Sequence, residues 1–122
     1  MKNIPLWEWL PPFRWRLIAS AEAADEIPQR LPRNAAVFVG SPASPKWIAF
    51  DCPCHRGHRI MLNLDGSRFP KWKLSSDSRL TLFPSIDVIY RGRRCHYFIQ
   101  AGRVRWVADS GIVGGRPARP MR

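Results

Sequence analysis

The chain has 122 residues, 45% of them hydrophobic, with twelve prolines, six tryptophans and a formal net charge of +11. The length is that of one domain, and the hydrophobic content excludes a disordered chain. No apolar run approaches the roughly 20 residues that a membrane-spanning helix needs. Glu8 and several prolines lie where a signal peptide would need an apolar stretch, so the sequence predicts a cytoplasmic protein without a membrane partner.

The first 33 residues are expected to form an N-terminal arm. Residues 1–16 alternate tryptophan, proline and arginine, a composition that favours extended chain bearing aromatic side chains. Residues 20–26, SAEAADE, are rich in alanine and acidic residues, and Pro28 follows them as a helix stop. The arm is therefore predicted to contain one short helix.

Residues 34–110 are expected to form a small antiparallel sheet domain, mostly β with a minor helical part. In residues 59–64 the apolar side chains occupy every second position, which is the period of a half-buried strand. Residues 80–90 also favour a strand, and Pro84 predicts a bend or bulge within it because proline cannot donate to a regular ladder. Ala101-Gly102 predicts a tight hairpin turn. The other expected strands are residues 35–39, 47–51, 72–74, 97–100 and 103–107.

Positive charge is concentrated towards the C-terminal end. Residues 91–122 contain eight arginines and a single acidic residue, Asp109. Such a segment favours an acidic partner, which is either nucleic acid or an acidic protein surface. Residues 111–122 are predicted to be a flexible basic tail, for which solubility alone is the alternative role.

The three cysteines lie in two places, the stretch CPCHRGH at residues 52–58 and the pair Cys95-His96. An odd number of cysteines in a chain without an export signal favours a metal site or free thiols over disulfides. Zinc prefers four thiolate or imidazole ligands in a tetrahedron. We therefore expect a structural zinc site of Cys52, Cys54, His58 and Cys95, with His55 as the alternative fourth ligand. Three buried thiols without a metal are the competing interpretation.

A second group has the residue types of a serine hydrolase. Ser85 follows a proline, at a bend that can expose its hydroxyl. His96 follows Cys95, and neighbours on a strand point to opposite faces, so Cys95 can face a metal while His96 faces a cleft. A nucleophilic serine needs a base, and the base needs an orienting group, here Asp109 or Asp87. Spacing alone is a weak signal, because a serine at a bend can also simply cap a turn.

Several motifs follow one another in an order shared with known proteins. They are the CPC cluster and residues 57–64 (GHRIMLNL), 70–72 (PKW), 82–86 (LFPSI), 95–99 (CHYFI) and 102–106 (GRVRW). In this order the chain resembles, over about residues 35–107, a small bacterial and phage family long labelled only as a domain of unknown function. Members of that family often lie beside genes for a ubiquitin-like protein, an activating enzyme and a conjugating enzyme.

The resemblance implies a zinc-binding fold and a serine peptidase that processes a ubiquitin-like protein or removes it from its conjugates. By position, Ser85 matches the serine of the Pro-Ser motif and His96 the histidine before the aromatic pair. The third catalytic residue stays open between Asp109 and Asp87. The family pattern has a further cysteine where this chain has Arg56, so a histidine is expected to replace it as a ligand. Association with the conjugation enzymes is also implied.

Three other functions fit parts of the sequence. A non-catalytic zinc-ribbon-like module that binds nucleic acid or an acidic protein fits the net charge and the position of Trp72 between Lys71 and Lys73. A zinc hydrolase would need a metal-bound water and hence an open coordination position. A structural subunit of a conjugation complex would bind its partners without turnover.

Overall fold

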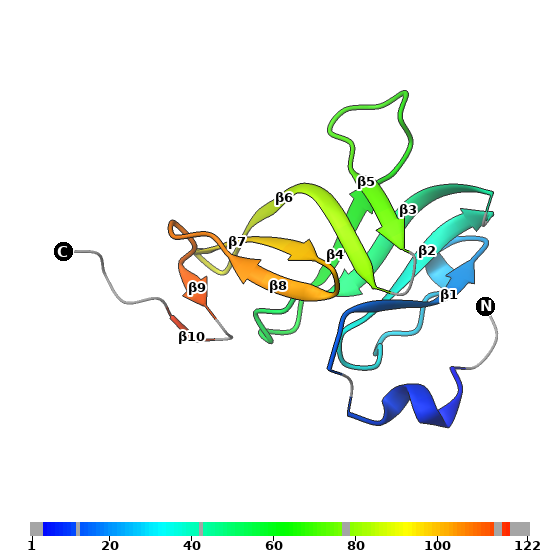
Figure 1. Ribbon diagram of the computed structural model, residues 1–122, viewed down its shortest axis with the longest axis horizontal. Helices are drawn as coiled ribbons and strands as arrows, with labels where there is room; N and C mark the ends of the chain where they lie inside the picture. Colours follow the sequence, from blue (N-terminus) through cyan, green and yellow to red (C-terminus); the bar gives the residue numbers. More distant parts are fainter. Residues whose placement is uncertain (1–3, 12, 42, 77–78, 114–115, 118–122) are drawn as a thin grey trace.

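Two four-stranded sheets form the body of the protein in a computed structural model (Figure 1). The structure describes residues 4–11, 13–41, 43–76, 79–113 and 116–117. The first sheet has the strand order β1-β2-β3-β4 and the second the order β5-β6-β7-β8. The mostly-β prediction is therefore confirmed.

The first sheet contains β1 (Arg16–Ala21), β2 (Ala35–Ser41), β3 (Ser44–Asp51) and β4 (Arg59–Asn63). The last three form an antiparallel meander, in which Ile48 pairs with Phe38 on one side and with Leu62 on the other. β1 instead pairs with β2 in parallel, because the chain returns through residues 22–34 before it enters β2. The alternation predicted for residues 59–64 is seen in β4, where Ile60 and Leu62 are buried and Met61 is exposed.

The N-terminal segment differs from the predicted arm. The helix expected at residues 20–26 is reduced to a single 3-10 turn, η2 (Ala24–Glu26), because Ser20 and Ala21 belong to β1 and pair with β2. A second 3-10 turn, η1 (Leu6–Trp9), precedes β1. Sheet pairing has thus outweighed the modest helix propensity of this segment. The boundaries at residues 33 and 111 stay predictions.

The second sheet contains β5 (Lys73–Ser76), β6 (Leu80–Tyr90), β7 (Arg93–Gln100) and β8 (Arg103–Trp106). The predicted irregularity at Pro84 is confirmed, since the β6–β7 register shifts between the pairs Leu82–Ile99 and Ile86–Tyr97. Phe83, Pro84 and Ser85 therefore lie outside the regular β6–β7 ladder, although Phe83 still pairs with Lys73 of β5. Figure 1 shows that the long β6 is strongly curved. The hairpin predicted at Ala101-Gly102 joins β7 to β8.

The hydrophobic core lies between the two sheets. Its fully buried members include Ile48 and Phe50 of β3 and Ile86 and Tyr97 of the second sheet. Trp15, just before β1, packs edge-on against Phe50 with the ring centroids 5.3 Å apart. The backbone around Trp15 also hydrogen-bonds to Gly102 and Leu80 of the second sheet, which ties the two sheets together.

The predicted tail contains two short paired strands. Ile112–Val113 (β9) and Arg116–Pro117 (β10) pair as a two-stranded antiparallel sheet. Ile112 is buried and belongs to the core, so this segment is part of the fold. The last residues of the predicted tail, 118–122, lie outside the described residues. Within the described ranges, no helix is long and apolar enough to cross a membrane.

Candidate functional site

A cysteine-histidine cluster joins the turn after β3 to β7. Cys52, Cys54, His58 and Cys95 place one ligand atom each within 4.8 Å of one another. The Cys54 Sγ lies 3.1 Å and the Cys95 Sγ 3.9 Å from Nε2 of His58. The turn is closed by the Cys52 N–H, which donates to the carbonyl of His58 at 2.9 Å. The four predicted ligands are therefore brought together across about 40 residues of chain.

The electrostatics of this cluster follow from its burial. All three cysteines are buried, and burial raises the pKa values of Cys52 and Cys95. Burial, with a smaller effect of Arg56, lowers the pKa of His58, which favours the neutral imidazole that binds metals. The His58 ring stacks on Tyr90 with centroids 4.0 Å apart. Three thiols and one neutral imidazole are a donor set that fits a zinc ion.

Arg56 lies against this cluster. Its guanidinium donates to Cys95 Sγ at 3.2 Å and to the carbonyl of Tyr90 at 2.8 Å. Its Nε is buried and has no hydrogen-bond partner in the part of the chain that the structure describes. The hydrogen bond from Arg56 opposes the effect of burial on the pKa of Cys95, although burial is the larger effect and the pKa stays raised.

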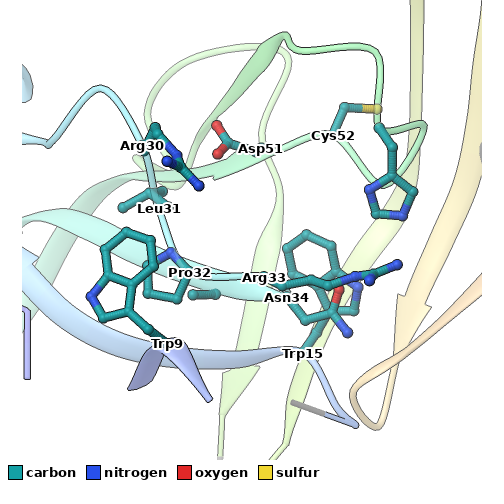
Figure 2. Close-up of a pocket in the computed structure, with 11 residues that line it drawn as sticks. Trp9, Trp15, Arg30, Leu31, Pro32, Arg33, Asn34, Asp51 and Cys52 are labelled. Atoms are coloured by element: carbon teal, nitrogen blue, oxygen red, sulfur yellow. The ribbon is translucent and has the colours of Figure 1, made fainter. Parts of the chain in front are cut away.

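His55, the alternative ligand, is directed elsewhere. Its backbone has a φ of +58°, and its side chain lines a recess of about 340 Å³ together with Arg30 and Arg33. Figure 2 shows Trp9, Trp15 and these two arginines around the same recess. Burial and the nearby Arg33 lower the pKa of His55. The structure thus separates the two histidines, with His58 in the cluster and His55 in a basic, aromatic recess.

A chain of hydrogen bonds on the other face of β7 links Ser85, His96 and Asp109. The Ser85 Oγ lies 3.0 Å from Nε2 of His96, and Nδ1 of His96 lies 2.6 Å from Oδ1 of Asp109. An ionised carboxylate only accepts hydrogen bonds, so the network places the imidazole proton on Nδ1. Nε2 is then free to accept from the Ser85 hydroxyl. The three predicted residues therefore meet in the order that general-base activation of a serine requires.

The two faces of β7 explain how adjacent residues enter different sites. Cys95 is fully buried and points to the cluster, whereas the His96 side chain is 16% exposed on the opposite face. Ser85 lies in the register shift of β6, which brings its hydroxyl to the His96 side. The alternation proposed from the pair Cys95-His96 is thus present in the structure.

Asp87, the other candidate for the residue that orients His96, binds Arg94 instead of the imidazole. It pairs with His96 across β6 and β7, but its carboxylate accepts two hydrogen bonds from Arg94, at 2.8 and 2.6 Å. Arg94 also contacts Oδ2 of Asp109 at 2.9 Å. The hydrogen bonds from Arg94 are the main cause that lowers the pKa of Asp87. Asp109 contacts His96 directly, and Arg94 bridges the carboxylates of Asp87 and Asp109.

The loop that carries Asp109 is held against the backbone of β7 by hydrogen bonds of Ser110 and Gly111. Ser110 is buried, and its hydroxyl accepts from the His96 N–H at 3.2 Å. The Gly111 N–H donates to the carbonyl of Arg94 at 2.8 Å, and a Cβ at Gly111 would lie 3.2 Å from the Arg94 nitrogen. Sequence reasoning missed both Arg94 and Ser110. Arg94 is one of many arginines in its segment and Ser110 has no motif, so neither carries a local signal.

The structure thus defines a small mostly-β domain with a cysteine-histidine cluster on one face of β7 and a serine-histidine-aspartate arrangement on the other. The family model of the bacterial ubiquitination-like system serine protease (BubE) matches residues 23–107, well over half of the chain. The chain therefore belongs to the BubE family. Ser85 and His96 lie within the match, and Asp109 lies two residues beyond it. No curated protein and no solved structure is significantly similar to the chain.

Proposed function

We propose that this protein is a zinc-stabilised serine peptidase that processes a ubiquitin-like protein or removes it from its conjugates. The observation that carries the proposal is the hydrogen-bonded series Ser85–His96–Asp109 in a member of a serine protease family. The family description names a bacterial ubiquitination-like system, which makes a ubiquitin-like protein the partner of first choice. The enzymes of that system are the expected associates.

In the proposed reaction Ser85 attacks the carbonyl carbon at the C-terminus of the ubiquitin-like protein. His96 takes the hydroxyl proton on Nε2 and then gives it to the leaving group as the bond to that group breaks. The product is an acyl ester on Ser85. A water molecule then attacks this ester, His96 accepts one proton of the water and returns it to the Ser85 oxygen, and the free carboxylate leaves. Asp109 holds His96 in the required tautomer throughout.

The cysteine-histidine cluster has a structural role in this proposal. Four protein ligands leave no coordination position for a water, so a zinc ion there would supply a cross-link between the turn after β3 and β7. Three thiolates and a neutral imidazole around Zn²⁺ carry one net negative charge, which the Arg56 guanidinium offsets at 3.2 Å from Cys95 Sγ. Because Cys95 precedes His96, fixing Cys95 also limits the movement of the base.

Labelling with a fluorophosphonate probe tests the proposal directly. We expect the purified protein to be labelled on Ser85, and labelling to be lost in Ser85→Ala and His96→Ala with unchanged folding and zinc content. A single-residue control is Ser75→Ala, which removes an exposed hydroxyl from β5 outside the site. Cleavage of a fusion to a bacterial ubiquitin-like protein follows as the second measurement. A folded, zinc-loaded protein that neither labels nor cleaves would contradict the peptidase assignment.

Binding of nucleic acid is the second candidate, and one surface favours it. The recess of Figure 2 combines Arg30 and Arg33 with Trp9, and a neighbouring recess of about 470 Å³ adds Arg103 and Trp106. Arginines interleaved with aromatic rings are typical of surfaces that bind single-stranded nucleic acid. Salt-dependent binding of a single-stranded oligonucleotide that is weakened in Arg33→Ala and unchanged in Ser85→Ala would support this function. The same experiment without binding would exclude it.

A further inference from the structure

An apolar recess lies at the loop between β4 and β5, and Trp72 in its wall contacts the backbone of Ser85. Its volume is about 320 Å³, and its apolar walls are Trp47, Met61, Phe69, Pro70 and Trp72. Met61 and Phe69 are exposed, at 41% and 88%, so the recess opens to solvent. In Figure 1 this green loop rises next to the curved β6. Apolar walls with few polar groups are typical of sites that bind apolar ligand groups.

The loop between β4 and β5, which forms part of this recess, is preorganised by the side chain of Asn63. The Asn63 side chain is nearly buried and donates to the carbonyls of Asp65, Arg68 and Pro70 at 3.0 to 3.3 Å. Its Oδ1 accepts from the Asp65 N–H at 3.0 Å. One buried amide thus binds the loop at both ends. A preorganised recess loses little conformational entropy when a side chain enters it.

Trp72 connects the recess to the proposed nucleophile. Its indole N–H donates to the backbone carbonyl of Ser85 at 3.3 Å, while its ring forms part of the recess wall. Phe83, two residues before Ser85, is 62% exposed on the same irregular stretch of β6. The recess is therefore one side chain away from the backbone of Ser85, and apolar surface continues on the neighbouring stretch of β6.

We infer that this recess is a specificity subsite that holds a bulky apolar side chain of the peptide substrate, close to the bond that Ser85 attacks. The inference rests on the proposed peptidase function. The cations at the rim set the selectivity further, since Arg68 lines the recess and Lys71 lies 5.5 Å from the centre of the Phe69 ring. A lysine or arginine of the substrate would meet these like charges, so large aliphatic and aromatic residues are selected over basic ones.

The test uses the full-length protein and a set of fluorogenic peptides that differ at the residues before the scissile bond. Wild type is expected to prefer leucine or phenylalanine over alanine and lysine at one of these positions. The double variant Met61→Ala, Phe69→Ala is expected to lose about tenfold in kcat/KM on the preferred peptide, the effect of a few apolar contacts. Its activity on the alanine peptide should stay unchanged. Ile89→Ala, which removes an exposed apolar side chain outside the recess, is the matched control.

The rate of labelling by a small fluorophosphonate separates the two proposals. The probe carries no side chain for the recess, so the double variant should label at the wild-type rate. Normal labelling with an unchanged peptide preference in the double variant would overturn the subsite while leaving the nucleophile intact. Failure of the wild type to label would overturn the peptidase function and the subsite with it.

Discussion

Replacement of Asp109 by asparagine tests the acid–base geometry of the site. The Asp109 carboxylate accepts from Nδ1 of His96 at 2.6 Å, which leaves Nε2 to accept from Ser85 at 3.0 Å. The carboxamide of asparagine can donate to Nδ1 instead. The imidazole proton then lies on Nε2, where the ring cannot take the proton of the serine.

The expected magnitude follows from the contact and its exposure. Inverting the tautomer in a buried triad lowers the rate by about 10⁴-fold. The Asp109 side chain is 49% exposed, so water competes with the asparagine amide for Nδ1 and screens the lost charge. We therefore expect a loss of about 10³-fold, which is about 4 kcal/mol in activation free energy.

The assay is the second-order rate of fluorophosphonate labelling, with Asp87→Asn as the matched control. Asp87 undergoes the same change of charge and shape, but its carboxylate hydrogen-bonds to Arg94, whereas the carboxylate of Asp109 bonds to the imidazole of His96. The labelling rate of Asp87→Asn should stay within about threefold of the wild-type rate, which is less than about 1 kcal/mol in activation free energy. Equal losses in both variants would mean that net charge near His96 matters and the contact does not. A loss confined to Asp87→Asn would refute the assignment of Asp109.

Three further predictions concern the surroundings of the proposed catalytic residues. Metal analysis of the purified protein should find one zinc ion per chain. Cys54→Ser should lose this zinc and unfold at a lower temperature in a thermal unfolding experiment, whereas His55→Ala should keep it. Arg94→Lys should slow fluorophosphonate labelling about tenfold with zinc retained, because a compact ammonium cannot hold two carboxylates as a planar guanidinium does. Labelling at the wild-type rate would contradict a role of Arg94 in positioning Asp109. The pKa of Asp87 is lowered in the folded protein, so its stabilising contribution is present above its unfolded pKa of about 3.9 and is lost as the pH falls through the folded value. Urea unfolding should therefore show a weaker acid dependence between about pH 5 and pH 2 in Asp87→Asn than in wild type.

Local chemistry was enough to predict most of the strands and one feature of the site. The alternation in β4, the irregularity at Pro84 and the turn at Ala101-Gly102 all follow from the period of a strand and the properties of proline and glycine. The opposite faces of Cys95 and His96 also follow from strand geometry. The helix expected at residues 20–26 failed because pairing of β1 with β2 depends on contacts that lie more than a dozen residues away.

Tertiary structure alone decided between the two candidate histidine ligands and between the two candidate aspartates. His55 is adjacent to Cys54 in the sequence and His58 lies four residues after it, but the path of the turn directs His58, not His55, to the sulfur atoms. Asp109 reaches His96 because Ser110 and Gly111 hold its loop against β7, and Arg94 joins two aspartates that lie 22 positions apart. The faces of a strand and the positions of tight turns depend on residues adjacent in the chain, so they can be predicted from the sequence. Contacts between loops depend on how whole sheets pack, which no local pattern records.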